Sequence, residues 1–193
     1  MIIGITGGSG CGKTTLLKEV EKLGGLVLDC DAIYHGLLKT DKAMLAAIEA
    51  RFPGTVEEGS LDRKKLGAIV FADGQALLDL NAITHSAVKK EVERLLKAAP
   101  ALAAIDAIGL IEGGLASLCD MTVAVTAPRE DRVARLMKRD GITREYAEKR
   151  LDAQKSEDWF RQQCGHVLAN TGSIQDFQAK CVAFLHEHCI MEA

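Results

Sequence analysis

Residues 7–14, with the sequence GGSGCGKT, constrain the fold of this chain more than any other feature. They fit the pattern G-x-x-x-x-G-K-[ST]. The apolar run at residues 1–6 before them is typical of a buried parallel strand. Residues 15–23 after them place four apolar side chains on one helical face, those of Leu16, Leu17, Val20 and Leu23. A strand, a glycine-rich loop and a helix in this order predict a phosphate-binding loop at the end of a strand.

The residue types in this loop suit a nucleoside triphosphate. Glycines let several backbone N–H groups point at phosphate oxygens, and the start of the following helix adds partial positive charge. Lys13 is expected to reach the β- and γ-phosphates, and the Thr14 hydroxyl is expected to bind Mg²⁺. The predicted contacts to ATP in the loop come from Gly10, Cys11, Gly12, Lys13, Thr14 and Thr15.

Apolar runs that alternate with helical patterns predict an α/β fold, a phosphate-loop (P-loop) NTPase with a five-stranded parallel sheet flanked by helices. Strands are expected at residues 1–6, 25–31, 101–106, 121–126 and 166–170, and a last helix at about 173–188. We expect one kinase unit over residues 1–193, with its core at 1–31, 100–128 and 156–193. A helical substrate-binding segment is expected at 32–99 and a helical lid at 129–155. Ligands of such folds bind at the carboxyl ends of the strands.

Composition excludes several classes of function. The net charge of −3, from 24 basic and 27 acidic residues, gives no support to a nucleic-acid partner. No apolar run is long enough to cross a bilayer, so we expect no membrane partner. The six cysteines include no C-x-x-C pair, which favours reduced thiols and a cytoplasmic protein. The sequence HEHC at 186–189 is either a metal-binding cluster or a helix end whose histidines favour the helix dipole.

Two features favour a kinase over a GTPase. Residues 126–129, TAPR, follow the fourth strand where a GTPase would carry Asn/Thr-Lys-x-Asp. Asp31, at the end of the second strand, suits a base that deprotonates an acceptor hydroxyl. Its alternative role is the N-cap of a helix over residues 32–39. Glu112, beyond the third strand, is expected in the same cleft.

Four arginines between the fourth and fifth strands recur at helical spacing, and they are Arg129, Arg132, Arg135 and Arg139. The sequence DGIT at 140–143 breaks this helix, and Thr143 can cap the next one. The stripe is either a solvated face paired with acidic neighbours or part of a lid whose arginines close over the triphosphate.

Blocks along nearly the whole chain resemble the dephospho-coenzyme A kinase family. They are GITGGSGCGKTT at 4–15, LGGLVLDCD at 23–31, GSLDR at 59–63, IVF at 69–71, LNAITH at 80–85, RLMKRDGIT at 135–143, Gln154, and LANTG at 168–172. The resemblance implies transfer of the γ-phosphoryl group of ATP to the ribose 3′-hydroxyl of dephospho-CoA, the last step of coenzyme A synthesis.

The resemblance also implies roles for individual residues. Asp31 would be the base, Lys13 and Arg139 would stabilise the transferred group, and Thr14 would bind Mg²⁺. Arg135 and Asn170 would contact ATP, with Asn170 near the adenine. The expected contacts to dephospho-CoA are Thr6, Asp31, Arg63, His85 and Glu112, although His85 is also explained as a hydrogen-bonded structural histidine.

Two other functions remain open at this point. The chain could phosphorylate another small-molecule hydroxyl, of a nucleoside or a sugar, with the same fold. It could also be a nucleotide sensor without catalysis. We expect a monomer or a weak homo-oligomer in each case.

Overall fold

The computed structural model describes residues 1–189, which form two compact units. The first unit contains residues 1–28 and the chain from Ala99 onward, and the second contains Asp29–Ala98. None of the helices within residues 1–189 is long and apolar enough to cross a membrane.

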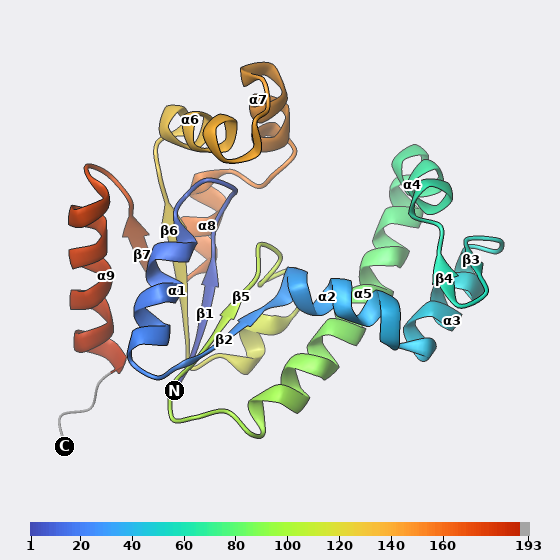
Figure 1. Ribbon diagram of the computed structural model, residues 1–193, viewed down its shortest axis with the longest axis horizontal. Helices are drawn as coiled ribbons and strands as arrows, with labels where there is room; N and C mark the ends of the chain where they lie inside the picture. The colour runs from blue at the N-terminus through green and yellow to red at the C-terminus, as the bar shows by residue number, and fades with distance from the viewer. Residues whose placement is uncertain (190–193) are drawn as a thin grey trace. The chain divides into compact units, whose positions relative to one another are not determined.

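The first unit is built on a five-stranded parallel sheet in the order β2-β5-β1-β6-β7 (Figure 1). Its strands are β1 (Ile2–Thr6), β2 (Leu26–Asp29), β5 (Ala103–Asp106), β6 (Met121–Thr126) and β7 (His166–Ala169). The central strand β1 pairs Ile3 with Ala104 of β5 on one side and with Met121 of β6 on the other. The predicted fold class is therefore confirmed.

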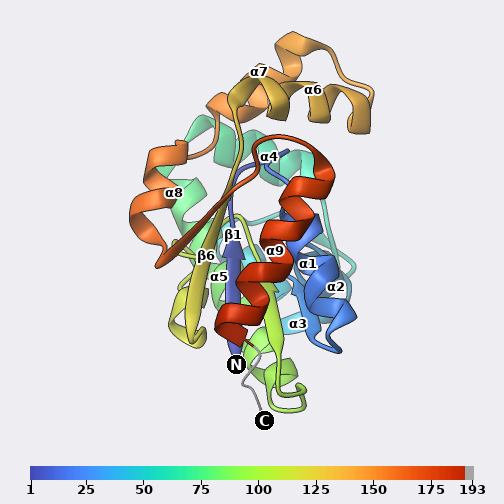
Figure 2. The ribbon, with the colours of Figure 1, turned by 90° about the vertical axis from the view of Figure 1, so that its left-hand side faces the viewer.

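Two helices cover one face of this sheet, namely α1 (Lys13–Lys22) and α9 (Ile174–Cys189) (Figures 1 and 2). The apolar side chains of α9 recur at spacings of four and three residues, at Phe177, Cys181 and Phe184, so that they form one buried stripe. The stripe packs with Leu16 and Val20 of α1 against the sheet. The short helix α8 (Glu157–Gln163) lies on the opposite face (Figure 2).

A helical hairpin lies beyond the carboxyl end of β6 and consists of α6 (Arg129–Asp140) and α7 (Arg144–Asp152) (Figure 1). Gly141 ends α6 with a left-handed backbone, and the Thr143 side chain accepts a hydrogen bond from the Tyr146 N–H at the start of α7. Val133 and Leu136 of α6 pack with apolar side chains of α7, which makes the hairpin a small core of its own. We call α6 and α7 the lid hairpin, after the lid that the sequence predicts at residues 129–155; that function remains a prediction.

The second unit contains α2 (Cys30–Thr40), α3 (Lys42–Arg51), α4 (Arg63–Ala72) and α5 (Gly74–Leu96). Its core gathers Met44, Ile48 and Phe52 from α3 and its end, with Leu66 and Val70 from α4. Between α3 and α4 the chain forms a short antiparallel hairpin of β3 (Val56–Glu57) and β4 (Ser60–Leu61), which the sequence analysis did not predict.

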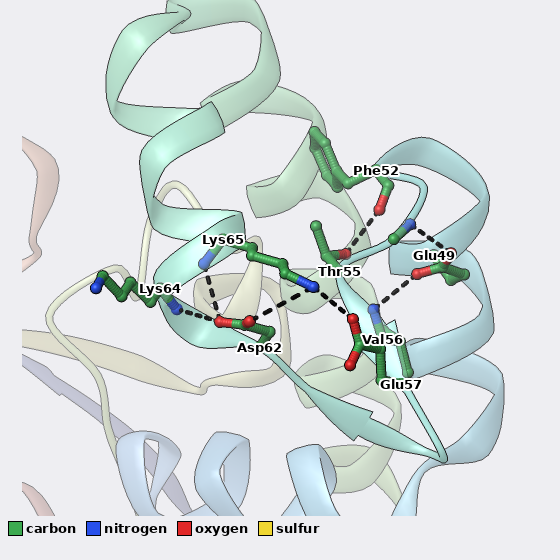
Figure 3. A network of polar contacts seen from close by, with 9 residues as sticks. Glu49, Phe52, Thr55, Val56, Glu57, Asp62, Lys64 and Lys65 are labelled. Carbon is green, nitrogen blue, oxygen red and sulfur yellow. Dashed lines mark hydrogen bonds and ion pairs between the residues drawn. The ribbon is translucent and has the colours of Figure 1, made fainter.

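Side chains around this hairpin fix its shape (Figure 3). The Glu49 carboxylate accepts the N–H groups of Gly54 and Val56, at 2.6 and 2.7 Å. The Asp62 carboxylate caps α4 by accepting the N–H groups of Lys64 and Lys65, and Lys65 also pairs with the carboxylate of Glu57. The turn between the strands has positive φ at Glu58 and at the following glycine, which suits a tight two-residue hairpin.

The boundary between β2 and α2 differs from the sequence expectation. The strand ends at Asp29, and the helix begins at Cys30. The Asp29 carboxylate is the N-cap, because it accepts hydrogen bonds from the N–H groups of Asp31 and Ala32 at 2.9 and 3.0 Å. Placing Asp31 on the strand was therefore wrong, and so was its alternative role as a cap.

Candidate active site

The phosphate loop connects the end of β1 to the start of α1, as the motif predicts. Gly7 has a φ of 138°, and a Cβ there would lie 2.2 Å from the Val125 carbonyl oxygen of β6. Gly12 has a φ of 103°, and a Cβ there would lie 2.3 Å from Nδ2 of Asn170. These two positions require glycine for both backbone conformation and space.

Lys13 is held at the centre of the loop by two oxygens. Its Nζ donates a hydrogen bond to the Gly7 carbonyl at 3.2 Å and lies 3.7 Å from Oδ1 of Asp106, at the end of β5. Both side chains are about one-fifth exposed, so the ammonium is oriented within the loop and is still reachable. Asp106 was not identified from the sequence, where the only signal was a carboxylate at the end of an apolar strand.

Thr14 and Thr15 lie in the first turn of α1, and Thr14 is exposed. No cluster of three or more His, Cys, Asp or Glu side chains able to hold a metal ion occurs among residues 1–189, the HEHC segment included. The Thr14 hydroxyl at the start of α1 and the Asp106 carboxylate near Lys13 are two oxygen groups able to bind a metal ion at the loop. A few hard oxygen ligands fit Mg²⁺, which takes its other ligands from phosphates and water.

The side chain of Asn170 holds the phosphate loop through a hydrogen bond. Its side chain is buried, and Nδ2 donates a hydrogen bond to the Cys11 carbonyl at 2.8 Å. Its own N–H donates to the Thr126 carbonyl at 2.7 Å, which ties the end of β7 to the end of β6. Burial raises the pKa of the neighbouring Cys11 thiol, which is 2% exposed. Asn170 thus contacts the predicted nucleotide-binding loop directly.

Two arginines of α6 lie against the backbone of the loop. Arg132 Nε donates to the Ser9 carbonyl at 2.9 Å, and Arg135 Nη1 donates to the Gly10 carbonyl at 3.0 Å. Burial lowers the pKa of Arg132 from its usual value. The lid hairpin therefore contacts the phosphate loop through two guanidinium groups. Arg132 and Arg135 are thus not part of a purely solvated face, which was one of the two interpretations of the arginine stripe.

The other two arginines of the stripe face acidic side chains. Arg139 donates to both carboxylate oxygens of Asp140, at 2.7 and 3.0 Å, and Arg129 pairs with Asp152 at 2.8 Å. The hydrogen bonds from Arg139, with a contribution from Arg150, lower the pKa of Asp140 to about 2. Arg139 is thus an exposed residue at the end of α6. The contacts with the loop are made by Arg135 and by Arg132, whose individual role the sequence did not reveal.

Thr6 and Glu112 occupy different environments in the first unit. Thr6 is fully buried at the end of β1, and its hydroxyl donates to the Ile108 carbonyl at 3.1 Å. Glu112 is exposed in the turns after β5. Thr6 therefore supports the segment after β5, while Glu112 is open to solvent.

The other predicted substrate residues belong to the second unit. Asp31 is exposed in the first turn of α2, and no residue within 1–189 makes a hydrogen bond or ion pair with its carboxylate. Arg63 is exposed at the start of α4, close enough to Tyr34 to lower the pKa of its phenol, although burial raises that pKa by more. His85 is half-buried on α5.

Comparison with known proteins decides the family. A family model described as dephospho-CoA kinase matches residues 1–176. The chain belongs to the dephospho-CoA kinase family. A dephospho-CoA kinase of Bacillus licheniformis is 34% identical over 186 residues, covering 93% of this chain and 92% of the relative.

Two solved structures are similar to nearly the whole chain. TT1252 from Thermus thermophilus is similar with a TM-score of 0.79 and 35% identity, over 97% of both chains. The dephospho-CoA kinase from Campylobacter jejuni is similar with a TM-score of 0.66 and 27% identity, over 96% of both chains. The chain is therefore a kinase with ATP and a small molecule, dephospho-CoA, as its substrates.

Proposed function

We propose that this chain transfers the γ-phosphoryl group of ATP, bound with Mg²⁺, to the ribose 3′-hydroxyl of dephospho-CoA, with Asp31 as the base. The observation that carries the donor side of this proposal is the position of Lys13. Its ammonium lies in the loop between the Gly7 carbonyl and the Asp106 carboxylate, at 3.2 and 3.7 Å. A cation fixed in this way is ready to neutralise charge on the β- and γ-phosphates.

The donor site combines backbone and side-chain groups with one metal ion. The N–H groups of the loop from Gly10 to Thr15 bind phosphate oxygens at the start of α1. Thr14 and Asp106 would hold Mg²⁺, which neutralises phosphate charge when it is bound. Asn170 keeps the Cys11 peptide in place through its 2.8 Å hydrogen bond. These groups orient the triphosphate and leave the γ-phosphorus open to attack.

The reaction needs one proton transfer on the acceptor side. The 3′-oxygen forms a new bond to the γ-phosphorus. The bond from the γ-phosphorus to the oxygen that bridges the β- and γ-phosphates breaks, and ADP leaves with that oxygen. The proton of the 3′-hydroxyl passes to the Asp31 carboxylate. Asp29 already caps α2, and this leaves the exposed Asp31 carboxylate available as a base. Arg63, His85 and Glu112 are assigned to binding the rest of dephospho-CoA.

The lid arginines stabilise charge on the transferred phosphoryl group. Arg132 and Arg135 support this role because they already lie against the phosphate loop, at 2.9 and 3.0 Å from its carbonyl oxygens. Arg139 reaches the phosphates only when its two hydrogen bonds to Asp140 are exchanged for new ones. A lid that closes over the substrates can supply that exchange.

Product analysis tests the proposal. The protein is incubated with Mg-ATP and dephospho-CoA, with adenosine, uridine, gluconate and shikimate in parallel as rival acceptors. Mass spectrometry should show one added phosphoryl group on dephospho-CoA alone, and phosphorus–proton coupling in NMR should place it on the 3′-oxygen. Phosphorylation at the 2′-oxygen, or of a rival acceptor at a similar rate, would contradict the proposal.

A further inference from the structure

Gln154 bridges the lid hairpin and the phosphate loop with three hydrogen bonds. It lies after α7 and before α8, and its carboxamide faces Ser9 of the loop. Oε1 accepts the Ser9 N–H at 2.9 Å and one hydrogen from Arg132 Nη2 at 3.2 Å. Nε2 donates to Oγ of Ser9 at 2.7 Å. Both polar ends of one side chain are thus engaged with the same loop residue.

Arg132 of α6 makes hydrogen bonds with both Ser9 and Gln154. Its Nε donates to the Ser9 carbonyl at 2.9 Å, while Nη2 is held by Gln154. The guanidinium covers the backbone of the loop so closely that a Cβ on Gly8 would lie 2.1 Å from Nη2. Hydrogen bonds at two different nitrogens fix the plane of the guanidinium, whereas a single bond through Nε would let it rotate.

The fold of the lid hairpin does not depend on this bridge. Its core is apolar, and α7 has its own cap at Thr143. The helix end is closed by the N–H of Gln154 itself, which donates to the Leu151 carbonyl and which any other residue except proline would provide. The carboxamide is therefore a contact to the loop and not a structural requirement of α6 or α7.

We propose that Gln154 is a positioning residue, which orients the Arg132 guanidinium across Gly8 and Ser9 and thereby couples the lid to the phosphate loop during phosphoryl transfer. This inference rests on the proposed function, because it gives Arg132 its task at the transferred group. Gln154 acts through Arg132 and needs no contact with ATP. Its loss should therefore lower kcat more than it raises the KM for ATP.

The kinetic test uses Gln154→Ala, Arg132→Ala and the double variant, with Gln162→Ala as the matched control because Gln162 is exposed on α8. Gln154→Ala should lower kcat by roughly 10- to 100-fold, as expected when a charged group loses its orientation, and should change the KM for ATP by less than about 3-fold. The double variant should be no slower than Arg132→Ala alone. Thermal unfolding of each variant shows whether it is folded.

A second measurement separates this inference from the proposed function. The Nε–Hε signal of Arg132 in ¹⁵N–¹H NMR spectra, assigned by its loss in Arg132→Ala, reports the order of the guanidinium without any substrate. We expect a rigid signal in the original protein and in Gln162→Ala, and a mobile one in Gln154→Ala. A failure to phosphorylate dephospho-CoA would remove the proposed function and leave this signal unchanged. Equal rigidity in Gln154→Ala, or additive kinetic losses in the double variant, would overturn the positioning role.

Discussion

Replacing Asn170 by alanine should loosen the phosphate loop by a predictable amount. The substitution removes a buried hydrogen bond of 2.8 Å between Nδ2 and the Cys11 carbonyl. Leaving a buried polar group without its partner costs about 1–3 kcal/mol. The Cys11 carbonyl also receives Arg135 Nη1 at 3.4 Å, a long contact that replaces only part of the loss. We therefore expect the free energy of unfolding of the first unit to fall within that range.

Fluorescence of Trp159 provides the assay. This tryptophan is the only one in the sequence and lies on α8 of the first unit, so urea unfolding followed by its emission reports that unit. Asn81→Ala is the matched control, because Asn81 lies on α5 of the second unit. The control should leave the fluorescence midpoint unchanged. An Asn170→Ala midpoint equal to that of the original protein would refute the idea that Asn170 holds the loop.

A substitution at Gly12 provides a second test of the packing between Asn170 and the phosphate loop. A Cβ at Gly12 would lie 2.3 Å from Asn170 Nδ2, and the φ of 103° adds strain that costs about 1–2 kcal/mol for a residue with a side chain. In the Asn170→Ala background the clash disappears and only the backbone strain remains. Gly12→Ala should therefore cost less in that background than in the original protein, and equal costs would contradict the geometry.

The remaining predictions concern the cores, a thiol and a carboxylate. Phe52→Ala should destabilise the second unit by about 3–5 kcal/mol, because the Phe52 side chain is only 2% exposed. Phe71→Ala should change the free energy of unfolding by less than about 0.5 kcal/mol, because Phe71 is 89% exposed. Equal urea midpoints of the two variants, measured by circular dichroism, would contradict this. Partial burial raises the pKa of Cys119 to about 12, so this thiol should react with a disulfide reagent at pH 8 much more slowly in the folded protein than in the unfolded protein. Equal rates of labelling at Cys119, located by mass spectrometry, would contradict this. The hydrogen bonds from Arg139 and Arg150 lower the pKa of Asp140 to about 2, from an ordinary value of 3.8. These hydrogen bonds therefore stabilise the folded protein fully at a pH above 3.8, and their contribution is lost as the pH falls toward 2. Carboxyl ¹³C NMR should give a midpoint near 2, and a midpoint near 3.8 would show that these pairs do not persist.

The sheet was predictable because each strand contains a short apolar run. Residues 121–126 were expected as a strand and form one with the same limits, and the break between α6 and α7 at Gly141 was visible in the sequence DGIT. The β3–β4 hairpin was missed because its strands are two residues each, too short for a periodic pattern. The start of α2 was misplaced because Asp29 and Asp31 are both good caps, and only the structure shows which of them accepts the N–H groups.

The part of the site that lies within one sequence motif was predictable, whereas the contacts between residues far apart in the sequence were not. The loop and Lys13 followed from residues 7–14 alone. Asp106 and Arg132 lie 93 and 119 residues further along the chain than Lys13, and a carboxylate or an arginine is too common to be chosen without the fold. Gln154 belonged to a matched block, but its bridge to Ser9 depends on the position of the lid hairpin. Sequence spacing does not encode such contacts.

The most direct test of the account is the turnover of Asp31→Asn compared with that of Asp29→Asn. Both substitutions remove one negative charge at the start of α2, but asparagine at position 29 still caps the helix. If Asp31 is the base, Asp31→Asn should lower kcat for dephospho-CoA phosphorylation by roughly 100- to 10,000-fold with ATP affinity nearly unchanged, and Asp29→Asn should keep most of its activity. An Asp31→Asn variant that turns over as fast as Asp29→Asn would contradict the assignment of the base.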